Sequence, residues 1–160
     1  MDQDMKYDGL RLKNHFCFPL YAASREIIKL YTPYLDELNL TYTQYLAMTL
    51  LWEYRTLTVK EMGEQLFLDS GTLTPLLKKL EGKGMVTRAR SAQDERNLNV
   101  SITEQGMALR EKARDIPLQI WKYNNLTREE SLQVFTLLHK LLRRNQDEAP
   151  DWSFFDRDDV

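Results

Sequence analysis

Apolar residues recur with helical spacing through most of this 160-residue chain. The stretch 16–31 carries such an apolar stripe, so we expect a helix there, ended by Pro33 and followed by a short helix at 33–38. Pro19 has no N–H to donate, and a proline is tolerated only in the first turn of a helix. We therefore expect the helix to begin near Phe16, after a separate lead-in segment at 10–15.

Two short helices in tandem follow a longer predicted helix at 43–54. Thr58 is a suitable N-cap for a helix at 59–66, and Asp69 is a suitable N-cap for one at 70–83. The second of these helices has leucines at i, i+3, i+4 and i+7, a stripe that we expect to be buried: Leu73, Leu76, Leu77 and Leu80. Its opposite face carries threonine and lysine and is left free for a partner.

Alternating apolar and polar residues then predict two strands, at 85–90 and 97–103, on either side of a polar turn. Pro75 lies in the preceding helix, where its position would normally donate to the carbonyl of Gly71, so we expect a loosened first turn there. Helix, turn, helix and two-stranded hairpin is the order of a winged helix-turn-helix. The sequence therefore predicts a mainly α-helical fold with a small β-hairpin wing.

Two more helices are predicted towards the C-terminus. One runs from about residue 103 to 116, and we expect it to continue past Pro117 with a kink. The other begins at a capping box formed by Thr127 and Glu130 and runs to about Asn145.

Charge is unevenly distributed along the chain. The net charge is −2, but residues 147–160 carry six acidic side chains against one arginine, which leaves +3 on the rest. Between Lys78 and Arg90, five basic residues oppose only Glu81. Such a local patch can bind phosphates even when the total charge is negative. The acidic tail at 147–160 is expected to be disordered.

Several function classes find little support in the sequence. No apolar run approaches the roughly 20 residues needed to span a bilayer, and the acidic N-terminus is unlike a secretion signal. We therefore expect a cytoplasmic protein that does not bind membranes. His15 and His139 have no cysteine or histidine nearby at metal-ligand spacing, and there is no glycine-rich phosphate loop. Neither a metal nor another cofactor is expected.

The polar face of the helix at 70–83 is suited to double-stranded DNA. Such a helix can lie in the major groove while an arginine-bearing hairpin reaches an adjacent groove or the backbone. Hydroxyls near the helix N-terminus would meet phosphate oxygens, and basic side chains would add salt-dependent affinity. The candidate DNA-binding residues are Ser70, Thr72, Thr74, Lys78, Lys79, Arg88 and Arg90. The alternative is that they are solvated charges on an ordinary α+β domain.

The same region resembles the MarR family of regulators. The run LDSGTLTPLLKKLE, from Leu68 to Glu81, resembles that family's recognition helix, and Asp94-Glu95-Arg96 followed by SITEQG resembles its wing. The resemblance implies a homodimer that binds a pseudo-palindromic operator. In the family the wing aspartate and arginine pair to brace the hairpin, and the arginine reaches the minor groove. Asp94 and Arg96 match those positions.

The resemblance extends from Leu12 to about Asn145 and implies a domain organisation. One dimeric MarR-like domain would span 1–146. Its dimerisation helices would lie at 10–54 and 104–146, and its winged helix-turn-helix at 56–103.

Cys17 is the single cysteine of the chain and cannot form a disulfide within it. Free cysteine is often buried, and Phe16 and Phe18 beside it suit a core. A cysteine in the first turn of a helix, however, feels the positive end of the macrodipole, which favours the thiolate that peroxides oxidise. Tyr21 and Tyr31, at i+4 and i+14, fall on the same helical face and can donate hydrogen bonds to a thiolate. The residues alone leave both interpretations open.

The segment from Leu12 to Glu26 resembles the one-cysteine branch of organic-hydroperoxide-sensing MarR repressors. It matches the branch pattern Leu-x-Asn-x-x-Cys-Phe-x-Leu-Tyr-x-x-x-Arg-Glu, although Pro19 stands where the branch has an ordinary apolar residue. The resemblance implies that Cys17 is the redox-sensing residue. It also implies that tyrosines, partly from the partner subunit, hydrogen-bond its thiolate: Tyr21, Tyr31 and Tyr42.

That branch also implies a signal and a response. An organic hydroperoxide would oxidise Cys17 to sulfenic acid, a low-molecular-weight thiol would capture it or over-oxidation would follow, and the dimer would release DNA. Two other regulators remain open: one that responds to small aromatic ligands, and a thiol-based regulator of broader stress or virulence programmes. A thiol peroxidase is the enzyme alternative, but one cysteine without a resolving partner suits a sensor better. We expect a regulator and not an enzyme.

Overall fold

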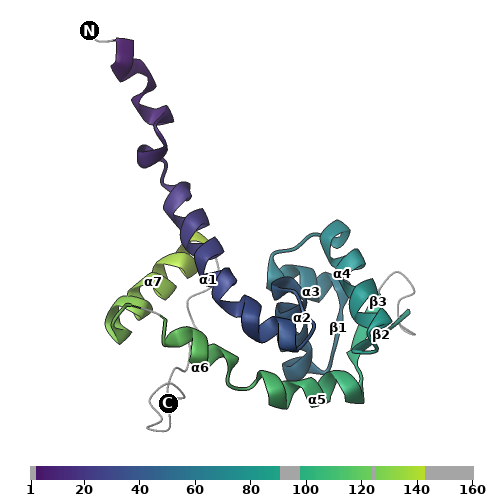
Figure 1. Cartoon of the computed structure of the whole chain (residues 1–160). Helices are drawn as coiled ribbons and strands as arrows, with labels where there is room; N and C mark the ends of the chain where they lie inside the picture. The colour runs from purple at the N-terminus through teal and green to yellow at the C-terminus, as the bar shows by residue number, and fades with distance from the viewer. Residues whose placement is uncertain (1–2, 91–97, 124, 143–160) are drawn as a thin grey trace. The chain divides into compact units, whose positions relative to one another are not determined.

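The structure, a computed structural model, describes residues 3–90, 98–123 and 125–142. The chain divides into two compact units, 1–114 and 115–160. Within the described ranges the first unit consists of η1 (Gln3–Leu10), η2 (Leu12–Asn14), α1 (Cys17–Glu37), α2 (Tyr42–Tyr54), β1 (Thr56–Thr58), α3 (Val59–Leu66), α4 (Ser70–Gly82), β2 (Val86–Arg90), β3 (Leu98–Ile102) and α5 (Glu104–Ala113) (Figure 1). The second unit contains α6 (Ile116–Trp121) and α7 (Arg128–Leu141).

α1 is one continuous helix of 21 residues, and Pro33 lies inside it. The predicted end at Pro33 and the separate helix at 33–38 are therefore wrong. Pro33 removes the hydrogen bond to the carbonyl of Lys29, but the neighbouring turns keep theirs. The helix ends instead where Asn39 adopts a positive φ of 53° and three leucines around the turn are buried: Leu35, Leu38 and Leu40. Burial of these leucines fixes the end of the helix more strongly than the proline does.

The predicted tandem helices are confirmed as α3 and α4. The side chain of Thr58 accepts a hydrogen bond from the N–H of Glu61, and that of Asp69 accepts one from the N–H of Thr72. The predicted stripe on α4 is buried, with exposed fractions of 0–8% at Leu73, Leu76, Leu77 and Leu80. α4 runs as one helix through Pro75.

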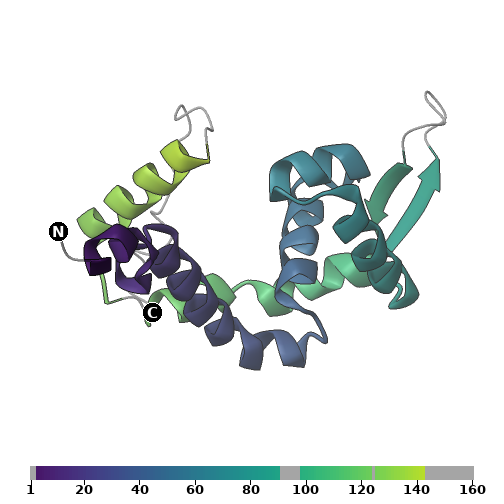
Figure 2. The same cartoon turned by 90° about the horizontal axis from the view of Figure 1, so that it is seen from above.

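The wing belongs to a three-stranded antiparallel sheet in the order β1-β3-β2. β2 and β3 confirm the two predicted strands, and Arg88 pairs with Val100 in their register. β1 was not predicted, because three residues that lead directly into the N-cap of α3 are too short to show an alternating pattern. Figure 2 shows β2 and β3 side by side, and β2 contacts α4. The wing and α4 are therefore packed together.

The helix predicted from 103 to beyond Pro117 is two helices. α5 ends at Ala113, and α6 begins at Ile116 with Pro117 in its first turn. A continuous helix would place the Pro117 ring against the carbonyl of Ala113 and leave that carbonyl without a donor. The break therefore precedes the proline, where the missing N–H costs no hydrogen bond. The expected kinked continuation is wrong.

The last predicted helix is confirmed by its cap. Thr127 and Glu130 form the capping box in which each side chain accepts from the other residue's backbone N–H, and α7 follows. α7 is described to Leu141, so the predicted end near Asn145 lies outside the described residues, as does the tail at 147–160.

The core of the first unit lies where α2, α3, α4 and the sheet meet. Its fully buried side chains come from all of these elements: Met48, Leu51, Met62, Leu73, Leu77, Leu80, Val86 and Val100. Burying one such side chain contributes about 1.5–3 kcal/mol. α5 is fastened to this core because the Trp52 indole donates to the Gly106 carbonyl at 2.9 Å. The buried face of α4 is therefore packed against this core.

Candidate functional site: a basic helix face and a single thiol

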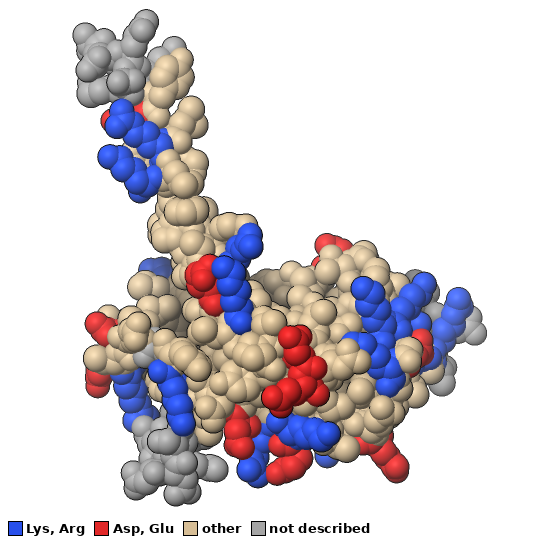
Figure 3. Space-filling model, in the orientation of Figure 1, with Lys and Arg blue, Asp and Glu red and all other residues tan. Residues whose placement is uncertain are grey.

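The solvent side of α4 carries the side chains predicted to meet DNA. Ser70, Thr72, Lys78 and Lys79 are exposed and Thr74 is half-buried, while the leucines of the same helix face the core. Figure 3 shows lysine and arginine gathered at the end of the first unit where α4 and the wing strands lie. A helix fixed by one apolar face and polar on the other can present its side chains to a groove.

The N-terminus of α4 is occupied by its own cap. One oxygen of the Asp69 carboxylate accepts from the Thr72 N–H at 2.8 Å, and the other accepts from the Thr72 hydroxyl at 3.3 Å. The backbone N–H of Thr72 lowers the pKa of Asp69, so the carboxylate stays ionised. A phosphate near this end would meet side chains rather than the N–H that Asp69 already binds.

Arg88 is held inside the protein's own framework. Its Nε and Nη2 donate to Oε2 of Glu81 at 3.0 and 2.6 Å, and its backbone N–H donates to Oε1 at 3.2 Å. The Arg88 side chain is only 16% exposed. Its hydrogen bond lowers the pKa of Glu81. Arg88 thus braces β2 against α4, whereas Arg90 on the same strand is exposed. Direct contact of Arg88 with phosphate stays a prediction.

The wing tip lies outside the described residues. Residues 91–97 include Asp94 and Arg96, so their pairing and the reach of Arg96 into a groove stay predictions.

Cys17 is the first residue of α1, and Phe16 is its N-cap, which confirms the predicted start of the helix. The thiol is exposed, and so are Phe16 at 67% and Phe18 at 40%. Among the described residues of the first unit, this segment is therefore not part of a packed core. Burial of Cys17 as an inert apolar residue finds no support within the first unit.

The three candidate tyrosines are not gathered around the thiol in one chain. Tyr21 lies one turn from Cys17, and its hydroxyl accepts from Nη1 of Arg25 at 2.8 Å. Tyr31 lies 14 residues further along α1 than Cys17, which at 1.5 Å per residue is about 21 Å along the axis. The shared helical face predicted from spacing is correct, but it does not bring Tyr31 to the thiol of its own chain.

Tyr31 instead meets Tyr42 where α1 and α2 join. Their ring centroids are 4.9 Å apart in an edge-to-face arrangement, and Tyr45 lies 5.8 Å from Tyr31. Burial raises the pKa of all three phenols, so that they remain protonated and able to donate hydrogen bonds. The contact of Tyr45 with Tyr31 was not predicted from the sequence, because it depends on how α1 and α2 pack.

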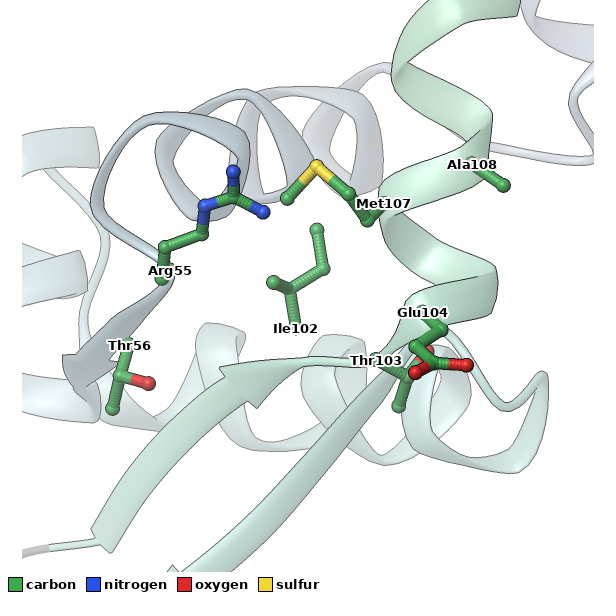
Figure 4. Close-up of a pocket in the computed structure, with 7 residues that line it drawn as sticks. All are labelled: Arg55, Thr56, Ile102, Thr103, Glu104, Met107 and Ala108. Atoms are coloured by element: carbon green, nitrogen blue, oxygen red, sulfur yellow. The ribbon is translucent and has the colours of Figure 1, made fainter.

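A shallow groove of the first unit lies apart from these residues. It is lined by Arg55, Thr56, Ile102, Thr103, Glu104, Met107 and Ala108. Figure 4 shows the Arg55 guanidinium beside Met107 and above Ile102. It holds neither the thiol nor any of the predicted DNA-binding residues.

Two observations concern other classes of site. In the part of the chain that the structure describes, His, Cys, Asp and Glu are nowhere grouped in threes or more in a way that could hold a metal ion. No helix in the described ranges is long and apolar enough to cross a membrane.

Known proteins resemble this chain over most of its length. A family model described as transcriptional regulator SarA/Rot matches residues 29–113. The organic hydroperoxide resistance transcriptional regulator of Bacillus subtilis is 55% identical over 137 residues, which cover 86% of this chain and 93% of that protein.

Solved structures agree with these sequence matches. Reduced AbfR bound to DNA has a TM-score of 0.69 and 36% identity, covering 87% of this chain and 96% of that one. A cysteine-to-serine mutant of Escherichia coli MarR complexed with operator DNA has a TM-score of 0.70 and 25% identity, covering 89% and 99%. The chain therefore belongs to the SarA/Rot family of transcriptional regulators, within the MarR-type winged helix-turn-helix proteins that include the regulator of organic hydroperoxide resistance.

Proposed function

We propose that this protein is a homodimeric transcriptional repressor that binds a pseudo-palindromic operator and releases it when an organic hydroperoxide oxidises Cys17. Derepression of peroxide-resistance genes would follow. The observation that carries the proposal is an exposed thiol at the first residue of α1, in a chain whose α4 presents a polar, basic face. The 55% identity to a regulator of organic hydroperoxide resistance supports the choice of signal.

Operator binding rests on α4 and the wing. α4 would enter the major groove with Ser70, Thr72 and Thr74 towards the bases or backbone. Lys78, Lys79 and Arg90 would neutralise phosphates and make the affinity salt-dependent. Arg96, braced by Asp94, would reach the minor groove from the wing tip.

The redox step has a simple balance. The Cys17 thiolate attacks the distal oxygen of the hydroperoxide, a sulfur–oxygen bond forms and the oxygen–oxygen bond breaks. Cys17 becomes a sulfenic acid, and the alkoxide leaves as an alcohol after taking a proton from water. A low-molecular-weight thiol then replaces the hydroxyl, forming a mixed disulfide and water. Further peroxide would instead over-oxidise the sulfur.

The tyrosines argue for a homodimer. The separation of 14 positions between Cys17 and Tyr31 keeps the Tyr31–Tyr42 pair away from the thiol at the start of its own α1. A second chain can bring its pair to that thiol, and the exposed apolar side chains around Cys17 offer a surface for it. Tyr21 would donate a hydrogen bond to the Cys17 thiolate of its own chain.

An enzyme and a different regulator are the competing functions. Cys17 is the single cysteine and has no resolving cysteine in the chain, which suits a sensor better than an efficient peroxidase. We therefore infer a regulator and not an enzyme, acting in a reducing cytoplasm where a free thiol persists. A response to small aromatic ligands would leave Cys17 dispensable.

Replacement of Cys17 tests the proposal. Cys17→Ser should bind operator DNA as tightly as the wild type in a gel shift but should not be released by cumene hydroperoxide. Intact mass spectrometry, with and without added cysteine, should show one mixed disulfide on the wild type and none on the variant. Release of the serine variant by peroxide would contradict the proposal.

A further inference from the structure

Of the three lysines in the basic stretch at 78–90, Lys83 is the one whose amine donates hydrogen bonds to other parts of the protein. It follows the last residue of α4, and it is half-buried where Lys78 and Lys79 are exposed. Its Nζ donates to the carbonyl of Asn39 and, at 3.2 Å, to Oε1 of Gln44. These two acceptors lie 44 and 39 residues away in sequence, in the turn between α1 and α2 and in the first turn of α2.

The acceptors of Lys83 belong to a hydrogen-bonded junction between α1 and α2. Gln44 is 3% exposed, and the oxygen that accepts from Lys83 also accepts from the Thr41 N–H at 3.1 Å. Asn39 is the left-handed residue that ends α1, and its carbonyl lies at the negative end of that helix. An ammonium group there is favoured by the helix dipole and closes the turn between α1 and α2.

The same junction carries the buried tyrosines. Tyr42 is the first residue of α2, directly after Thr41, and its ring meets Tyr31 on α1 at 4.9 Å. Tyr31 and Tyr42 therefore lie in the same α1–α2 junction as the turn whose carbonyl binds Lys83. The turn cannot shift without moving an acceptor of Lys83.

The backbone at Lys83 is hydrogen-bonded to the elements next to the wing. Its backbone carbonyl accepts from Gln105 of α5 at 3.3 Å, and the next carbonyl, of Gly84, accepts from the Thr103 hydroxyl at 2.6 Å. Two residues earlier, Glu81 holds Arg88 of β2. The end of α4, the wing and the start of α5 are thus joined at one point, and Lys83 joins that point to the α1–α2 turn.

We propose that Lys83 is the positioning residue that transmits a change at the Tyr31–Tyr42 pair to α4 and the wing. It acts on operator affinity through its two hydrogen bonds to the α1–α2 junction and not through a phosphate contact. This role rests on the proposed function, since it requires that oxidation of Cys17 alters the engagement of the tyrosines. In this role Lys83 differs from Lys78 and Lys79, which are proposed to neutralise phosphates.

The test measures operator Kd for the reduced and the peroxide-oxidised protein and takes the ratio of the two. Lys83→Met keeps the length and apolar surface of the side chain but loses both hydrogen bonds. Couplings between sites typically change affinity by about 5–150-fold, so we expect the ratio to fall by at least about fivefold towards 1. Lys83→Arg keeps the charge and the donors and should restore most of the ratio.

Lys79→Met is the matched control, because it removes a lysine from the exposed face of the same helix. It should weaken DNA binding of both forms by the same factor and leave the ratio unchanged. Melting curves confirm that each variant is folded, and Lys83→Gln provides a second neutral replacement.

The possible outcomes separate the two proposals. If wild type releases DNA on oxidation and Lys83→Met shows the wild-type ratio, the role of Lys83 is overturned while the repressor function stands. An equal loss of affinity in both forms of Lys83→Met also overturns it. If oxidised wild type keeps its DNA affinity, the repressor function fails and the role of Lys83 fails with it.

Discussion

The two ends of α1 differ in how much of their surroundings one chain supplies. At its C-terminal end Tyr31 packs on Tyr42 and Tyr45, and the turn that follows is closed by Lys83. At its N-terminal end Phe16, Cys17 and Phe18 are exposed. Within the described residues of the first unit, the junction beside α4 is therefore packed, whereas the thiol is exposed. The difference teaches that each chain forms its own α4 surface, whereas the proposed redox site depends on a second chain.

The largest effect is expected in the core beneath α4. Leu77 is fully buried, and Leu77→Ala should lower the free energy of unfolding by about 2–5 kcal/mol, because it leaves a cavity. Urea denaturation measures the change. Lys78→Ala, on the exposed side of the next position, should change it by less than about 0.5 kcal/mol. If both variants lowered the free energy of unfolding by similar amounts, the claim that only the leucine face of α4 is packed against the core would be wrong.

A smaller effect is expected at the DNA-facing lysines. Lys79→Ala should weaken operator binding and flatten the dependence of log K on log salt by about 2 per dimer, one phosphate contact for each chain. Fluorescence anisotropy over a salt series measures the slope. Lys29→Ala, an exposed lysine on α1 paired with Glu26, is the control and should leave the slope unchanged. An unchanged slope in Lys79→Ala would remove Lys79 from the DNA surface.

The smallest effect is expected from the Glu81–Arg88 pair. Arg88 depresses the pKa of Glu81, so the pair stabilises the fold above the ordinary glutamate pKa and loses that contribution as pH falls through the depressed value. Wild type should therefore lose stability between about pH 5 and pH 3 more steeply than Arg88→Met. Thermal melts across this range measure the slopes. Identical slopes would mean that the pair does not contribute in solution.

The helix starts that were predicted correctly depend on interactions between residues close together in the sequence. The caps Thr58, Asp69 and Thr127 act on residues three positions away, and they were correctly identified. Pro33 was misinterpreted because burial of the leucines around residue 38 continues the helix beyond it. β1 exists through its pairing with β3, which is distant in sequence.

The candidate site divides in the same way. The polar face of α4 followed from helical periodicity, and the position of Cys17 in the first turn of α1 followed from Pro19, which is tolerated only there. The contacts of Arg88 with Glu81 and of Lys83 with Asn39 did not, because both depend on how separate elements pack. Periodicity placed Tyr31 on the face of Cys17, and the 14 positions that separate them along the helix already imply about 21 Å. The packing of Tyr31 on Tyr42 and Tyr45 did not follow from the sequence, because it depends on how α1 and α2 meet.

The most direct test of the central claim uses heterodimers with a single Cys17. In the first, a wild-type chain is paired with a chain carrying Cys17→Ser, Tyr31→Phe and Tyr42→Phe, so the remaining thiol faces a partner without the two hydroxyls. In the second, a Cys17→Ser chain is paired with a chain carrying Tyr31→Phe and Tyr42→Phe, so the partner's hydroxyls are intact.

The measured quantity is the rate at which limiting cumene hydroperoxide converts Cys17 to sulfenic acid. A hydrogen bond to a charged group is worth about 1.5–3 kcal/mol, so the first heterodimer should react at least about tenfold more slowly than the second. Equal rates, or a slower second heterodimer, would contradict the account that the partner subunit completes the redox site.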